Sequence, residues 1–181
     1  MDELQRIAPT VAVDEDLPVD EQLSMLAMLV GRTDELQRQR SAYRSTLERL
    51  ADQIPDSVRQ RVFASIVVAS GGLSFHTRAN PNPIGQAMRD LELLLSGITE
   101  NDDLYVGIEA SQVLEHGDDA DVLLVESRSD HPATVERWSD LRAVRLGNVH
   151  EVPTPSGVSY PAAIRAVESL SPFLLGLDRA A

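Results

Sequence analysis

Two nearly continuous apolar segments constrain the fold of this chain more than any other feature. Residues 61–69 read RVFASIVVA, and residues 121–126 read DVLLVE. Apolar and β-branched side chains at consecutive positions are typical of strands that are covered on both faces, as in a parallel sheet. Such a sheet needs a layer of helices on each side. The two segments therefore predict an α/β fold of three layers, with a mostly parallel sheet flanked by helices.

The rest of the chain alternates between helix and strand patterns. Apolar periodicity, turn residues and capping residues define these elements. The predicted helices are residues 20–30, 33–54, 84–95, 109–115, 132–141 and 162–170, and the predicted strands are residues 7–13, 61–69, 104–108, 121–126 and 148–152. A chain of 181 residues is long enough for one such domain with an appendage.

The longest predicted helix, residues 33–54, has no glycine or proline inside it. We expect Thr33 to cap its first turn and Pro55 to end it. Its apolar side chains fall on one narrow stripe, which consists of Leu36, Tyr43, Leu47, Leu50 and Ile54. A stripe this narrow predicts a helix that lies along a surface, and the pattern alone fits an ordinary amphipathic surface helix.

Composition and charge exclude several classes of function. The formal net charge of −13 argues against nucleic acid and against anionic membrane surfaces, because both require positive potential. The chain has no cysteine, so disulfides, iron–sulfur clusters and thiolate metal sites are excluded. It has no lysine, which excludes Schiff-base and P-loop chemistry. No segment has the apolar length of a membrane span, and the N-terminus of this chain has no signal-peptide pattern.

Three polar loops follow the predicted strands at one edge of the sheet. They comprise residues 70–83, 127–132 and 153–160. In sheets of this type, ligands bind beyond the carboxyl ends of the strands. The first loop is long for a strand–helix connection, and long loops in compact domains are often functional. We therefore expect any ligand to bind at these loops.

Two arginines lie in these loops although the chain is strongly acidic. Arg78 and Arg128 each present a planar fork of donors that suits carboxylate, phosphate or catecholate oxygens. Pairing of these arginines with acidic neighbours such as Asp130 is an equally good interpretation. Nearby aromatic side chains could supply a stacking surface. The predicted ligand-binding residues are Phe75, His76, Arg78, Arg128 and Tyr160.

Familiar catalytic and metal-binding motifs are absent from the sequence. There is no G-x-G-x-x-G after a strand, no Walker A motif and no G-x-S-x-G motif. The four histidines are scattered and lack the spacing of metal ligands. We therefore predict no catalytic residue, no metal site and no cofactor. A Ser–His–Asp triad stays open as an alternative, because its members are not local in sequence.

Several short motifs occur in an order that is informative when they are taken together. Residues 138–150 read WSDLRAVRLGNVH, residues 7–11 read IAPTV, and Glu109 precedes the DADV of residues 119–122. This order resembles the iron–siderophore and vitamin B12 binding proteins of ABC importers, and it extends over nearly the whole chain. Such proteins have two α/β lobes joined by a long helix, with the ligand held in the cleft between the lobes.

The resemblance implies a division of the chain into three parts. Residues 1–32 would be the end of the N-terminal lobe, residues 33–54 the linker helix between lobes, and residues 55–181 the C-terminal α/β lobe. The chain would then be the C-terminal part of a longer exported protein, or a natural relative with one lobe. If so, the C-terminal half of the apolar stripe should pack on this lobe, while its N-terminal end protrudes or finds a substitute partner.

The function implied by the resemblance is substrate binding for an ABC-type ferric siderophore importer, without catalysis. The ligand would be a small iron chelate, and the arginines favour a partly anionic ferric siderophore over cobalamin. Glu109 matches the acidic residue with which the family docks on the permease, although an acid at a helix N-terminus is an alternative interpretation. The full-length protein would be extracytoplasmic. A dimer through the surface left by the missing lobe, an α/β-lobe enzyme and a cytoplasmic small-molecule sensor remain alternatives.

Overall fold

The computed structural model describes residues 11–12, 17, 19–69, 72–76, 82–96, 105–109, 112–127, 135–152 and 159–177. The predicted strand at residues 7–13 lies almost entirely outside this part of the chain. Within the described residues, no helix is both long and apolar enough to cross a membrane.

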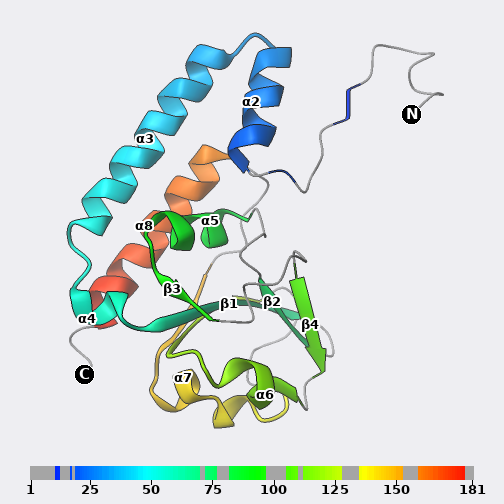
Figure 1. The fold of residues 1–181 in the computed structure, drawn as a ribbon, viewed down its shortest axis with the longest axis vertical. Coiled ribbons are helices and arrows are strands. Elements are labelled where there is room, and N and C mark those ends of the chain that lie inside the picture. Colours follow the sequence, from blue (N-terminus) through cyan, green and yellow to red (C-terminus); the bar gives the residue numbers. More distant parts are fainter. Residues whose placement is uncertain are drawn as a thin grey trace, which may run out of the picture.

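The described elements alternate between helix and strand along most of the chain (Figure 1). In order they are α2 (Val19–Leu29), α3 (Thr33–Ala51), α4 (Asp56–Arg59), β1 (Val62–Ala69), β2 (Gly72–His76), α5 (Pro83–Asp90), β3 (Leu94–Leu95), β4 (Tyr105–Glu109), α6 (Val113–Gly117), β5 (Val122–Ser127), the 3₁₀ helix η4 (Trp138–Asp140), α7 (Arg142–Arg145), β6 (Val149–Glu151) and α8 (Tyr160–Gly176).

The described strands form one sheet of six, in which β1 is central. The order is β4-β2-β1-β5-β6, and β3 pairs with the first two residues of β1. β1 pairs in parallel with β5, and β5 pairs in parallel with β6. β2 is antiparallel to both of its neighbours, so among the described strands it alone runs against the common direction. The prediction of a mostly parallel sheet is confirmed.

Helices cover both faces of this sheet, which confirms the three predicted layers. On one face, α3, α5 and α8 enclose a core with Phe63, Val122 and Leu124 of the strands. On the other face, α6, η4 and α7 enclose a second core with Ile66 and Leu123. Figure 1 shows α3, α5 and α8 above the sheet and α6 and α7 below it. Burial of alternate strand residues on opposite faces explains why the two strand sequences are apolar at consecutive positions.

Two strands were not expected from the sequence. β2 lies inside the segment predicted as one continuous loop, where Leu73 pairs with Val68 of β1. β3 replaces the last turn of the helix predicted for residues 84–95. That helix ends because Glu92 adopts a left-handed conformation with φ 56°, which frees the chain to run beside Val62 of β1.

Two predicted helices have different bounds in the structure. The helix expected at residues 109–115 begins at Val113, and Glu109 is instead the last residue of β4. Whether a helical turn starts directly after Glu109 stays untested, because residues 110–111 lie outside the described part of the chain. In the segment predicted as helix at residues 132–141, the described part is a turn and the 3₁₀ helix η4. Arg137 has φ 59° there, which interrupts regular helix geometry.

Helix α3 has most of its predicted extent but a different cap. Thr33 is the first helical residue, and Arg32 stands at the N-cap without a capping hydrogen bond from its side chain. The preceding helix, α2, ends as expected at Gly31. There φ is +65° and the amide of Arg32 donates to the carbonyl of Ala27 at 2.7 Å. This hydrogen bond is the Schellman pattern, in which glycine is favoured.

The apolar stripe of α3 is buried unevenly, as the sequence analysis expected. Tyr43, Leu47 and Leu50 are buried against the core that includes α8, and Ile54 is buried just beyond the helix. Leu36 near the N-terminal end is only partly buried. At this end α3 packs against α2, which extends away from the sheet in Figure 1. α2 is therefore the substitute partner of the N-terminal part of α3.

Candidate functional site

The carboxyl ends of the parallel strands meet at one edge of the sheet. The register pairs Val68 of β1 with Ser127 of β5, and Val125 of β5 with Glu151 of β6. Large parts of the loops predicted at this edge lie outside the described residues, namely 70–71, 77–81, 128–134 and 153–158. Arg78 and Arg128 belong to these parts, so their positions stay predictions. We refer to the strand ends as the carboxyl edge.

The backbones of Phe75 and His76 lie in strand β2 and not in a loop. Phe75 pairs with Ile66 of β1 and with Val106 of β4, while His76 pairs with Tyr105. Because β2 runs opposite to β1, these two residues lie further from the carboxyl edge than Gly72 does. The expectation that they belong to a loop is wrong, and their side chains lie outside the described part of the structure. Glu109, in contrast, pairs with Gly72 and so lies at the carboxyl edge.

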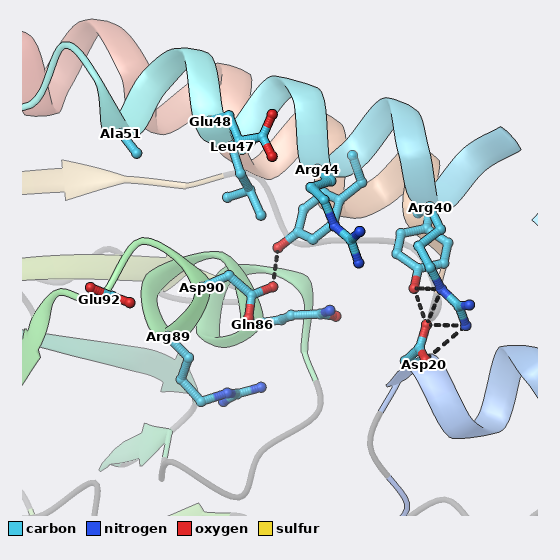
Figure 2. A pocket seen from close by; sticks show the side chains of 12 residues that line it. Asp20, Arg40, Arg44, Leu47, Glu48, Ala51, Gln86, Arg89, Asp90 and Glu92 are labelled. Atoms are coloured by element: carbon cyan, nitrogen blue, oxygen red, sulfur yellow. Dashed lines mark hydrogen bonds and ion pairs between the residues drawn. The ribbon is translucent and has the colours of Figure 1, made fainter. Parts of the chain in front are cut away.

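Tyr160, the remaining predicted ligand residue, belongs to a polar cluster formed by Asp20, Ser24, Arg40 and Tyr160. Asp20 accepts two hydrogen bonds from Arg40, from Nε and Nη2, each at 2.8 Å. The Tyr160 hydroxyl donates to Asp20 and accepts from Arg40 Nε at 3.3 Å. Arg40 Nη2 also donates to Ser24 Oγ at 3.1 Å. This cluster, which we call the Asp20–Arg40 cluster, joins α2, α3 and the start of α8 (Figure 2).

The ring of Tyr160 is 4% exposed and packs against Tyr43 with a centroid distance of 5.6 Å. Tyr43 is equally buried, and its hydroxyl donates to Asp90 at 2.7 Å. Asp90 is the last residue of α5, so this hydrogen bond ties α5 to α3. The two tyrosines thus hold the start of α8 and the end of α5 against one helix. The predicted role of Tyr160 as a stacking surface is untested, and the structure gives its ring a packing role.

The electrostatic environment keeps both tyrosines neutral and Arg40 charged. Burial, followed by the nearby charge of Asp90, raises the pKa of Tyr43. Burial and the hydrogen bond to Asp20 raise the pKa of Tyr160. Hydrogen bonds to Tyr160 and Asp20 raise the pKa of Arg40. At neutral pH each tyrosine is therefore a hydrogen-bond donor to a carboxylate.

The described residues hold no arrangement that indicates a metal site or a catalytic triad. Within this part of the chain, no three potential metal-ligating side chains come together. Of the histidines, only His150 has a described side chain, and it stacks on Phe173 at a centroid distance of 4.5 Å. His76 and His131, the histidines in the predicted loops, have side chains outside the described part.

The Asp20–Arg40 cluster was not anticipated from the sequence. Its members are separated by up to 140 residues, so no local pattern brings them together. One signal was present in α3, where Arg40 stands three residues before Tyr43 on the side that faces the domain. A buried aromatic residue beside an arginine on a helix could have pointed to a polar contact at the edge of the core.

Comparison with known proteins gives information about the fold. No protein-family model matches the sequence, and no curated protein sequence matches it. Solved structures of siderophore-binding proteins do match. One match is the siderophore periplasmic binding protein of the fuscachelin gene cluster of Thermobifida fusca, with a TM-score of 0.77 at 20% sequence identity. The alignment covers 97% of this chain and 67% of the Thermobifida fusca protein.

Two further matches have bound ligands. FhuD2 from Staphylococcus aureus with ferrioxamine B has a TM-score of 0.79 at 17% identity, and the alignment covers 98% of this chain and 72% of FhuD2. The triscatecholate siderophore binding protein FeuA from Bacillus subtilis, complexed with ferri-bacillibactin, has a TM-score of 0.75 at 16% identity. That alignment covers 96% of this chain and 65% of FeuA. The chain thus has the fold of about two thirds of these binding proteins, and the matches are binding proteins, not enzymes.

Proposed function

We propose that this chain is part of the substrate-binding component of an ABC-type importer for ferric siderophores. The observation that carries the proposal is the likeness of nearly the entire chain to siderophore-binding proteins, two of which hold a ferric siderophore. The short motifs in the sequence favour the same class independently of the structure. The proposed role is recognition without catalysis, and the full-length protein acts outside the cytoplasm.

The ligand would bind at the carboxyl edge. Arg78 and Arg128 are proposed to pair with anionic oxygens of the chelate, because guanidinium forks suit carboxylate and catecholate groups. Phe75 and His76 are proposed to contribute contacts from β2. Tyr160 is proposed to contribute by fixing the start of α8, since its ring is almost fully buried. Glu109 at the same edge is proposed to dock on the permease.

The division of the chain into 1–32, 33–54 and 55–181 is also a proposal. It is supported by the outer surface of α2 and the turn after it, where four large apolar side chains are exposed to between 44% and 71%: Leu26, Met28, Leu29 and Val30. Several large apolar side chains exposed on one short segment are typical of an interface. We propose that the other lobe covers it.

A second copy of the chain is the alternative occupant of this surface. Sedimentation velocity of the chain and of a Met28→Glu variant tests the alternative, because Met28 is 71% exposed and its replacement should not affect folding. A dimer that dissociates in the variant would support the second copy. A monomer in both cases excludes it.

The function is tested by calorimetric titration of the full-length protein with ferrioxamine B and ferri-bacillibactin, each compared with its iron-free form. Calorimetry is preferred to tryptophan fluorescence because Trp138, the single tryptophan, is buried between the sheet and α7 on the face away from α3. Saturable binding of at least one ferric complex, with weaker binding of its iron-free form, is expected. Absence of binding across a broader panel of ferric siderophores would refute the proposal.

A further inference from the structure

A groove of about 560 Å³ runs between α3 and α5. Tyr43 and Leu47 form part of its wall, and the Asp20–Arg40 cluster closes one end (Figure 2). Its volume lies within the range of about 300–1,000 Å³ that is usual for small-molecule sites. We call it the α3–α5 groove.

Charged side chains line this groove in a fixed order along α3. Arg40 of the Asp20–Arg40 cluster comes first, Arg44 follows one turn later, and Glu48 stands one turn after that. Arg44 and Glu48 are four residues apart, yet among the described residues neither side chain forms a hydrogen bond or an ion pair. An arginine placed before a glutamate at this spacing is the less favourable order for pairing within a helix. Both groups are therefore available to a ligand.

The opposite wall continues the same arrangement. Arg44 from α3 and Arg89 from α5 both line the groove. Glu92, which follows α5, lies toward the end where Glu48 is found. Glu92 reaches this position because its left-handed conformation turns the chain at the end of α5. Asp90, whose carboxylate accepts from Tyr43, also lines the groove, so the lining carries both signs of charge, with Glu48 and Glu92 toward the end away from the Asp20–Arg40 cluster.

Gln86 supplies the observation that separates this groove from an ordinary charged surface. Its side chain lines the groove from α5, and its Oε1 atom is buried with no hydrogen-bond donor among the described residues. A buried amide oxygen without a donor is unfavourable, and such groups commonly mark a site where another molecule supplies the hydrogen bond. Gln86 stands three residues before Arg89, so the unmatched acceptor and the guanidinium lie on neighbouring positions of one helix face.

We propose that the α3–α5 groove binds a basic α-amino acid. The carboxylate pairs with the Arg44 guanidinium, the α-ammonium donates to Gln86 Oε1, and the side-chain cation lies between Glu48 and Glu92. The carboxylate and the side-chain cation of the ligand then each meet a group of opposite charge, and the α-ammonium supplies the donor that Gln86 Oε1 lacks. A ligand with net positive charge also suits a chain whose formal net charge is −13.

The test uses three probes that differ by single charged groups. L-lysine carries all three groups, L-norleucine lacks the side-chain ammonium, and cadaverine lacks the carboxylate. Binding is followed by calorimetry and by the NMR signals of the Gln86 side-chain amide and the Arg44 Nε–H group. L-lysine should bind at least about tenfold more tightly than either of the other probes, which is the effect of one charge-assisted hydrogen bond.

Three exposed-site variants assign this selectivity to the groove. Arg44→Gln should remove the preference for L-lysine over cadaverine, and Glu48→Gln should reduce the preference over L-norleucine. Arg49→Gln is the matched control, because it removes the same charge as Arg44→Gln but Arg49 lines a different groove, between α3 and α8. It should leave all three affinities unchanged.

Several results would overturn the proposal. Equal affinity for the three probes would indicate attraction to the acidic surface in general, and no saturable binding of L-lysine would indicate a groove filled by solvent. Unchanged selectivity in Arg44→Gln would place the ligand elsewhere. None of these results depends on siderophore binding at the carboxyl edge, so this proposal and the proposed function fail separately.

Discussion

Replacing Leu50 and Leu36 of α3 by alanine, one at a time, measures how unevenly this helix is held. Leu50 is 4% exposed within the core shared with α8, whereas Leu36 is partly buried near the N-terminal end. Leu→Ala substitutions in a core lower the free energy of unfolding by about 2–5 kcal/mol, so we expect about 3 kcal/mol for Leu50→Ala. For Leu36→Ala we expect about 1 kcal/mol or less, because less apolar surface is lost there.

The comparison is well controlled because both substitutions are the same and both lie within one helix. Any difference in helix propensity between leucine and alanine is small and cancels between the two variants. Urea unfolding followed by far-UV circular dichroism gives the two free energies, with equal m-values as the sign that the compared states are unchanged. Equal losses, or a larger loss for Leu36→Ala, would refute the uneven support of α3 and with it the interpretation of α3 as a linker between lobes.

Three further predictions concern polar contacts. A double-mutant cycle with Arg40→Gln and Asp20→Asn should give a coupling free energy of unfolding of about 1 kcal/mol. The value is modest because the pair is doubly hydrogen-bonded but the Asp20 side chain is 47% exposed, and zero coupling would contradict the cluster. Asn82→Ala should cost about 1 kcal/mol in urea unfolding, because Asn82 Oδ1 caps α5 through the amide of Gly85 at 2.6 Å, and an unchanged midpoint would exclude this cap. The pKa values of Tyr43 and Tyr160 are raised in the folded protein, so both side chains stay protonated there when the unfolded chain ionises. The free energy of unfolding is therefore fully retained below about pH 10, the pKa of unfolded tyrosine, and falls as the pH rises further. Ultraviolet absorbance titration should therefore show two of the three tyrosines ionising late, and ionisation of all three near pH 10 would contradict this.

The three-layer fold could be predicted because its main signals are local. The apolar runs that became β1 and β5 needed no tertiary information, and Gly31 marked the end of α2 through its backbone conformation. The spacing of short motifs pointed to siderophore-binding proteins, whose solved structures share this fold.

Other features depend on contacts that sequence periodicity does not contain. β2 is five residues long and begins at the second of two consecutive glycines, so its local pattern resembled a loop. Its antiparallel pairing with β1 and β4 decides its conformation. β3 continues an apolar helical pattern and is a strand only because β1 is beside it. The hydroxyl of Tyr160 is bonded to Asp20, which is 140 residues away in the sequence. These elements were fixed by distant partners and not by local preference.

The proposed siderophore site is tested most directly by backbone amide chemical shifts of the protein during titration with the gallium(III) complexes of ferrioxamine B and bacillibactin. Gallium(III) replaces iron(III) without paramagnetic broadening. Saturable shifts centred on the carboxyl edge, including Gly72, Glu109, Ser127 and Ser159, are predicted, with little change at the outer face of α8. No saturable shift with any siderophore complex, or shifts confined to surfaces away from the carboxyl edge, would contradict the proposed function.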